Sequence, residues 1–187
     1  MEITYNEKQV DVSEKLKAHC NEALSATVEK YFADAFDAIV SFSKEGESFD
    51  AEIVVHPAKE LILKGSGNGA DPYSAFDDAL SKINTRLRRN KSKISARKGK
   101  VSYAEVANMS VFSFDTNNEA ELEVEQTPLT IAETGAMVPT CSVSEAIMHM
   151  DLSSEDALMF KNSATNQINM VYLRKDGNIG WVEPKSA

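Results

Sequence analysis

The stretch PYSAFDDALSKINTRLRRNKSKISARKGK, residues 72–100, predicts a long helix with two different sides. Its apolar residues recur at three- and four-residue steps, which places them on one face of a helix. Positions 82–100 hold nine basic residues and no acidic one. At about 100° per residue, some of these cations form a line that lies roughly 130° from the apolar stripe. We therefore expect the helix to pack by one side and to hold a line of cations up to solvent on the other. The stripe consists of Tyr73, Phe76, Leu80, Ile83, Leu87 and Ile94, and the line of Lys82, Arg86, Arg89 and Lys93.

The run of like charge on this helix indicates a polyanionic partner. Exposed helix faces usually mix charges of both signs, because like charges four residues apart lower the stability of a helix. Here the cations continue for more than three turns without a carboxylate. Nucleic acid is the partner that this pattern favours. A plain solvated surface, a membrane surface and an acidic protein remain as alternatives.

Charge is distributed unevenly along the 187 residues, whose formal net charge is −9. Residues 1–100 contain 16 basic and 16 acidic side chains, whereas residues 101–187 contain 4 and 13. This asymmetry predicts two units with different tasks, and the acidic half discourages non-specific binding to nucleic acid. With 42% hydrophobic residues, the chain can bury a sizeable core. We expect domains at 1–100 and 128–187, joined by an acidic linker at 101–127.

The first 100 residues predict the order strand, helix, strand, strand, strand, helix. Strands are expected at 1–5, 38–43, 49–56 and 61–67, where the residue pattern is typical of strands separated by short polar turns. Asp11 and Glu14 have the spacing of a helix start, and apolar residues at helical steps continue to about Phe32. The glycine-rich run 65–69 lacks the spacing of a nucleotide-binding loop and is interpreted as a flexible connector. The expected fold class is α+β, with a four-stranded sheet and two helices on one of its faces.

The second half of the chain predicts a linker and a small α/β domain. Residues 115–128 are acidic and polar and end at a proline, so we expect a flexible linker there. The short apolar stretch 109–114 has no assigned role. If the apolar strand 168–172 lies at a sheet edge, it can pair with a second copy of the chain. The alternative is a monomeric domain in which that strand is central. In this domain a helix is expected at 142–150 and strands at 157–160, 167–173 and 179–182.

The sequence carries no motif of an enzyme or a metal site. Cys20 and Cys141 lie far apart without metal-ligand spacing, and the three histidines are scattered. The signatures of serine and cysteine hydrolases are also absent. We therefore expect a protein that is not an enzyme, with no cofactor, no metal ion and no small-molecule substrate. The chain shows no signal-peptide pattern and no apolar run long enough to span a membrane, so we expect a cytoplasmic protein with free thiols and no membrane partner.

Residues 1–98 and 128–184 resemble the long-form hibernation promoting factors, a family of bacterial ribosome-binding proteins. The resemblance rests on the order of strands and helices, on the PYSAFDDALSKINTRLRRNK helix with its basic tail, and on the segment MFKNSATNQINMVYLRKDGNIGWVEP. It implies that the N-terminal domain binds the small ribosomal subunit in the mRNA and tRNA channel and contacts ribosomal RNA. It also implies that the C-terminal domain pairs with its copy on a second ribosome. The result would be a 100S dimer that does not translate in stationary phase or stress.

The resemblance also assigns residues to these two tasks. Two places depart from the family's pattern: Leu173 and Arg174 stand where two arginines are frequent, and Lys161 stands where arginine is frequent. The positions that match the family's ribosomal RNA contacts are Lys82, Arg86, Arg88, Arg89, Lys91 and Lys93. Those that match its dimer interface are Phe160, Ile168, Met170, Val171, Tyr172 and Trp181.

Two other functions remain open from the residues alone. One is a general double-stranded RNA-binding module fused to an oligomerisation domain. The other is a protein-interaction module whose basic helix docks on an acidic partner, such as the acidic linker of the same chain.

Overall fold

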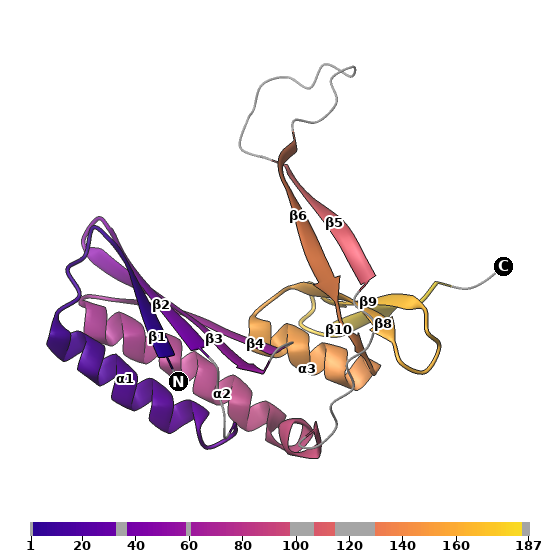
Figure 1. Ribbon diagram of the computed structural model, residues 1–187, viewed down its shortest axis with the longest axis horizontal. Helices are drawn as coiled ribbons and strands as arrows, with labels where there is room; N and C mark the ends of the chain where they lie inside the picture. Colours follow the sequence, from indigo (N-terminus) through magenta and orange to yellow (C-terminus); the bar gives the residue numbers. More distant parts are fainter. Residues whose placement is uncertain (1, 33–36, 59–60, 98–106, 115–129, 185–187) are drawn as a thin grey trace.

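The computed structural model describes residues 2–32, 37–58, 61–97, 107–114 and 130–184, and it contains two four-stranded sheets with helices packed on them (Figure 1). The N-terminal elements are β1 (Glu2–Lys8), α1 (Glu14–Val28), β2 (Asp37–Glu45), β3 (Ser48–Ala58), β4 (Leu61–Gly69) and α2 (Pro72–Arg97). The elements that follow are β5 (Ala107–Phe114), β6 (Thr130–Val138), β7 (Thr140–Cys141), α3 (Val143–Ser153), β8 (Ala157–Asn162), β9 (Ile168–Leu173) and β10 (Ile179–Val182).

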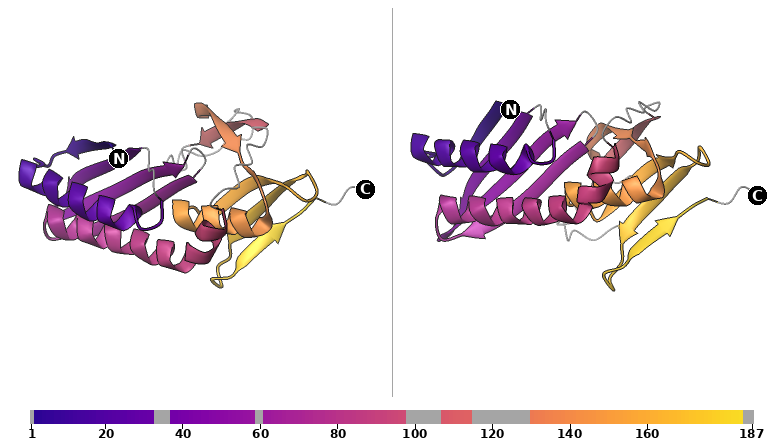
Figure 2. Two further views of the ribbon diagram at one scale, coloured as in Figure 1. Left: turned by 60° about the horizontal axis from the view of Figure 1, so that its bottom comes forward. Right: turned by 90° about the horizontal axis from the view of Figure 1, so that it is seen from below.

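The N-terminal sheet has the strand order β1-β2-β3-β4, with β1 parallel to β2 and the other pairs antiparallel. Both α1 and α2 cover the same face of this sheet (Figures 1 and 2). Along β2, Ala38, Val40 and Phe42 are buried toward the helices, while the residues between them are only partly buried. Such alternation is typical of a sheet with one covered face. The predicted fold class and the order of these elements are confirmed.

Helix α1 begins later and ends earlier than the sequence predicted. Its N-cap is Ser13, whose hydroxyl accepts a hydrogen bond from the backbone N–H of Leu16 at 3.3 Å. Asp11 has the spacing of a helix start to Glu14 but lies before the observed N-cap, so the predicted first residue of the helix was wrong. Serine is as good an N-cap as aspartate, and spacing alone does not choose between them. The helix ends at Val28 rather than at Phe32.

The glycine-rich run after Leu63 belongs to β4 rather than to a connector. β4 continues to Gly69 and pairs with β3 along its length. A Cβ added to Gly65 would lie 2.8 Å from the carbonyl oxygen of Ala79 and 2.6 Å from Cγ1 of Ile83, both in α2. These glycines therefore let α2 approach the sheet closely. The connector interpretation was wrong because it considered only the flexibility of glycine. Here the small size of glycine is the property that matters, since it permits close packing of the helix.

The C-terminal sheet has the order β10-β9-β8-β7, and α3 packs beside it (Figure 1). The predicted helix and three strands are present, with bounds that differ from the prediction by at most three residues. A capping box begins α3: the Ser142 hydroxyl accepts from the N–H of Glu145, and the Glu145 carboxylate accepts from the N–H of Ser142. Strand β9 lies between β8 and β10 and is therefore central. Of the two alternatives for 168–172, an edge strand or a central one, the structure has the central one, because strand order is set by tertiary pairing.

Strand β5 lies inside the segment predicted as a linker. It pairs antiparallel with β6, from Ala107 opposite Val138 to Phe114 opposite Thr130 (Figure 1). This strand within 101–127 was not predicted: Val111, Phe112 and Phe114 are good strand formers, but their partner strand is distant in sequence. The remainder of 101–127 lies outside the described residues. The domain boundaries at 100 and 128 also fall there, so they stay predictions.

Candidate nucleic-acid interface

The basic helix is fixed in place at its start and along its apolar side. Asp71 precedes α2, and its Oδ1 accepts from the backbone N–H groups of Tyr73 at 2.9 Å and Ser74 at 3.0 Å. These bonds, led by the one from Ser74, hold the pKa of the Asp71 carboxyl below its usual value. Of the predicted apolar stripe, Tyr73 is exposed, with its ring beside His19. The stripe residues buried in the core are Phe76, Leu80, Ile83, Leu87 and Ile94.

Arg88 and Lys91 are two exposed cations of α2. Both side chains are exposed, and neither forms a hydrogen bond or ion pair with the part of the chain that the structure describes. They lie on a different side of the helix from the predicted line of cations, at rotations of roughly 240° and 180° from Lys82 at 100° per residue. Neither side chain has to leave a partner among the described residues before it contacts a phosphate group.

Lys82 is exposed but already has two partners. Its Nζ lies 2.8 Å from Oδ2 of Asp78, one turn earlier, and donates to the carbonyl oxygen of Ser66 in β4 at 2.8 Å. The hydrogen bond from Lys82 lowers the pKa of Asp78. Lys82 therefore stabilises the fold, because it donates a hydrogen bond to a backbone carbonyl at the edge of the sheet. About half of its side chain stays exposed to solvent.

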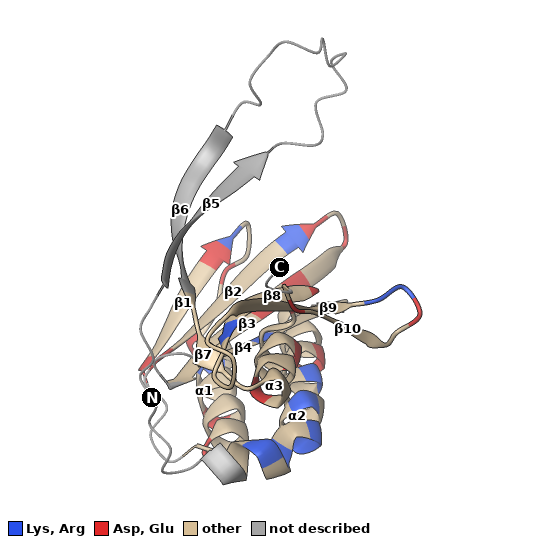
Figure 3. Cartoon of the chain, turned by 90° about the vertical axis from the view of Figure 1, so that its right-hand side faces the viewer, with Lys and Arg blue, Asp and Glu red and all other residues tan. Residues whose placement is uncertain are grey.

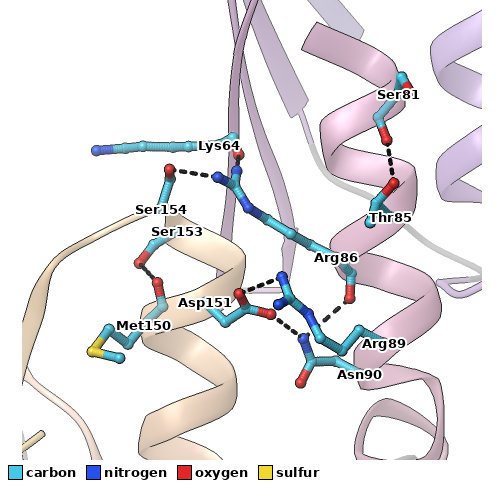
Figure 4. A network of polar contacts seen from close by, with 10 residues as sticks. All are labelled: Lys64, Ser81, Thr85, Arg86, Arg89, Asn90, Met150, Asp151, Ser153 and Ser154. Atoms are coloured by element: carbon cyan, nitrogen blue, oxygen red, sulfur yellow. Dashed lines mark hydrogen bonds and ion pairs between the residues drawn. The ribbon is translucent and has the colours of Figure 1, made fainter. Parts of the chain in front are cut away.

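The other predicted contact cations form contacts with the C-terminal domain, although the Arg89 side chain stays 63% exposed. Arg89 donates from Nη2 to Oδ1 of Asp151 at 2.8 Å, and Arg86 donates from Nη2 to Oγ of Ser154 at 2.8 Å (Figure 4). Lys93 approaches the carbonyl oxygen of Ser144 at 3.5 Å. Figure 3 shows the basic segments of α2 in blue beside α3. Of the predicted line, Lys82 and Arg89 are exposed and Arg86 and Lys93 are half-buried. The contacts with the C-terminal domain were not predicted, because helix geometry gives the direction of a side chain and not its neighbours.

The predicted dimer residues divide between two faces of the C-terminal sheet. Phe160 and Val171 are fully buried in the domain's own core, and Trp181, opposite Val171 in the register, shares their face and remains half-exposed. Trp181 Nε1 donates to Oδ1 of Asn169 at 2.9 Å. Phe160 and Val171 therefore have no surface for a second copy in this arrangement. The predicted residues on the opposite face are Ile168, Met170 and Tyr172.

Two further apolar residues lie on that opposite face and were missed in the sequence. Met159 and Val182 both pair with Met170 in the strand register and are 40% and 46% exposed. Paired residues of an antiparallel sheet share a face, so these side chains form one apolar surface with Met170. The signal was available as alternation along the strands, but it needed the register to be read.

Among the residues that the structure describes, no group of three or more His, Cys, Asp or Glu side chains is placed to hold a metal ion. None of the described helices is both long and apolar enough to cross a membrane. Burial raises the pKa of the Cys20 thiol to about 12, and the nearby Asp77 adds to this rise. Cys20 is therefore an inert core residue.

Residues 3–95 match the family model of the sigma 54 modulation protein/S30EA ribosomal protein, and residues 125–180 match the model of its C terminus. The ribosome hibernation promotion factor of Bradyrhizobium diazoefficiens is 34% identical over 192 residues, which cover 98% of this chain and 95% of that protein. The chain belongs to the long-form ribosome hibernation promotion factor family.

Another family member, the ribosome hibernation promotion factor of Rhizobium meliloti, is 32% identical over 98% of this chain and 97% of its own length. Among solved structures, the N-terminal domain of Protein Y from Thermus thermophilus is 25% identical, with a TM-score of 0.41. The similarity covers 48% of this chain and 98% of that domain. The two family models and the two relatives confirm the family resemblance seen in the sequence over both halves of the chain.

Proposed function

We propose that this chain silences ribosomes by binding the small ribosomal subunit through α2, in the channel used by mRNA and tRNA. The observation that carries this proposal is the basic helix. Among the described residues, its Arg88 and Lys91 have no hydrogen-bond or ion-pair partner, so both are available to phosphate groups. Similarity to proteins named ribosome hibernation promotion factor supports it. A role on the ribosome also fits a location in the cytoplasm.

Electrostatics and shape are sufficient for such a function. Lys and Arg contacts to phosphates supply affinity with little sequence information, and the affinity falls steeply as salt rises. Folded RNA is recognised mostly through its shape and its backbone. A rigid helix held close to a sheet can occupy a channel walled by phosphates, and occupancy alone excludes mRNA and tRNA. No catalytic group is needed for this action.

In this proposal, two copies of the chain bind each other through their C-terminal domains. Its outer sheet face carries Met159, Met170 and Val182 side by side, with two of them substantially exposed. A second copy that presents the same face would bury this apolar surface symmetrically. Because β9 is central, we propose pairing by face packing rather than by addition of a strand to β9. Two such chains, each on a small subunit, would join ribosomes into a 100S dimer.

The ribosome-binding role is tested by reversing the charge of the accessible cations. We expect Arg88→Glu with Lys91→Glu to lose co-sedimentation with purified small subunits, because two attractive phosphate contacts become repulsive. The matched control is Lys15→Glu with Lys175→Glu, which makes the same change in net charge at exposed positions away from α2. Equal binding of the two double variants would contradict the assignment. Equal competition by free duplex RNA would favour a general RNA-binding module instead.

The pairing role is tested with Met159→Lys in the full chain. Met159 is exposed, so the substitution leaves the fold intact. A buried lysine without a partner at a dimer interface costs several kcal/mol, so we expect sedimentation to show a monomer at concentrations where the wild type is a dimer. Lys175→Met serves as a control at an exposed turn outside the sheet face. A Met159→Lys dimer as stable as the wild-type dimer would contradict face packing.

A further inference from the structure

Helix α3 is shared by the two cores of the molecule. Ala146 and Met150 pack against Phe160 and Val171 in the core of the C-terminal domain. Met148 and Leu152 point away from that core and belong to the N-terminal one, where they are only 0% and 1% exposed. Two large apolar side chains four residues apart form one side of a helix, so α3 presents a second apolar side that the N-terminal domain covers.

A polar network surrounds this apolar contact and involves the basic helix (Figure 4). Asp151 accepts two hydrogen bonds, from Arg89 to Oδ1 at 2.8 Å and from the Asn90 side chain to Oδ2 at 2.6 Å. Asn90 is itself buried and also donates to the carbonyl oxygen of Arg86. Both oxygens of the Asp151 carboxylate are thus bound by α2. The contact between α2 and α3 therefore includes specific hydrogen bonds to both carboxylate oxygens.

The end of α3 adds two more contacts to the same side of α2 and to β4. Arg86 donates to the Ser154 hydroxyl at 2.8 Å and, from its other terminal nitrogen, to the carbonyl oxygen of Lys64 at 2.6 Å. Lys64 also forms an ion pair with Glu155, with Nζ and Oε1 3.0 Å apart. The C-terminal domain therefore places two carboxylates against cations of the N-terminal domain.

The carboxylate of Asp151 binds Arg89 as a phosphate group would. A guanidinium binds carboxylates and phosphates through the same charge-assisted hydrogen bonds. Three of the proposed RNA-contact cations, Arg86, Arg89 and Lys93, are engaged by α3 or the residues next to it. A phosphate group that takes the place of Asp151 on Arg89, or of Ser154 on Arg86, has to displace these contacts of the C-terminal domain, although 63% of the Arg89 side chain is exposed.

We propose that the C-terminal domain masks its own chain's RNA-binding helix, and that α3 must leave α2 before the side with Arg86, Arg89 and Lys93 can bind RNA. This inference rests on the function proposed above and concerns the regulation of that site. The apparent dissociation constant then equals the intrinsic one divided by the fraction of molecules in which α3 has left. Arg88 and Lys91 remain accessible in the closed form and supply the first encounter with RNA.

The test uses Asp151→Asn in the full chain, because asparagine keeps the shape of the side chain and removes its charge. We expect this variant to bind isolated small ribosomal subunits about 5- to 10-fold more tightly than wild type at the same salt concentration, which corresponds to about 1–1.4 kcal/mol. Small-angle scattering without ribosomes should show a larger radius of gyration. Glu183→Gln is the matched control, since it removes one carboxylate from an exposed position of the same domain away from α3.

The outcomes separate this inference from the function on which it rests. If wild type does not bind small subunits even at low salt, the proposed function itself fails. If wild type binds and Asp151→Asn binds no more tightly, the masking inference is overturned while the function stands. Equal tightening by Glu183→Gln would also overturn it, because the effect would then come from net charge alone.

Discussion

Replacing Gly65 with alanine tests how closely α2 packs on β4. Gly65 lies on the face of the sheet that α2 covers, and an added Cβ would lie 2.8 Å from the backbone oxygen of Ala79. It would also lie 2.6 Å from Cγ1 of Ile83, whereas nonbonded carbon atoms rest at about 3.5–4.0 Å, so the helix has to move away from the sheet. Overpacking of this kind lowers the free energy of unfolding by about 1–3 kcal/mol. For a domain of this size, each 1 kcal/mol lowers Tm by roughly 4–8 °C.

We therefore expect Gly65→Ala to lower the Tm of the N-terminal domain by roughly 4–24 °C in thermal unfolding followed by circular dichroism. Ser66→Ala is the neighbouring control. Ser66 is exposed on the open face of the same strand, so its replacement should change stability by less than about 0.5 kcal/mol. Equal Tm values for the two variants would refute the close packing of α2 on this strand.

Three further predictions concern helix ends and a buried thiol. Because the folded-state pKa of Asp71 is lowered, its contribution to stability is present above its unfolded pKa of about 4 and is lost as pH falls through the folded value. We therefore expect Asp71→Asn to flatten the acid side of a curve of Tm against pH. An unchanged curve would contradict this. Ser142→Ala removes the capping box of α3 and should lower the free energy of unfolding by about 1 kcal/mol in urea titrations, whereas an equal loss on Ser163→Ala, at an exposed turn position, would count against it. Cys20, with its pKa raised to about 12, should resist alkylation at pH 8 until the chain unfolds, and rapid labelling of the native chain would argue against its burial.

The N-terminal fold was predictable because its signals are local in sequence. Strand alternation such as that of Ala38, Val40 and Phe42 and the helical stripe from Phe76 to Ile94 each describe one element and the face that it buries. Short turns then leave few ways to connect the strands. Errors occurred where one residue type has two physical roles, as with Gly65, whose lack of a side chain serves close packing.

The contact between the two domains could not be predicted, because it joins residues far apart in sequence. Arg89 and Asp151 are 62 positions apart, and no local sequence pattern links the two residues. The sequence did hold one clue. Met148 and Leu152 make α3 apolar on a second side, which indicates that neighbours cover the helix on both sides. The central place of β9 depends in the same way on pairing that no local pattern specifies.

The most direct test of ribosome binding through α2 is a sucrose gradient of purified ribosomes with the full chain, run at about 50 mM and 200 mM salt. We expect wild type at low salt to move with the ribosome peak and with a new, heavier peak, and to be largely released at the higher salt. Arg88→Glu with Lys91→Glu should remain at the top of the gradient at both. Wild type that stays at the top at low salt, or a double variant that sediments with ribosomes as wild type does, would contradict the account.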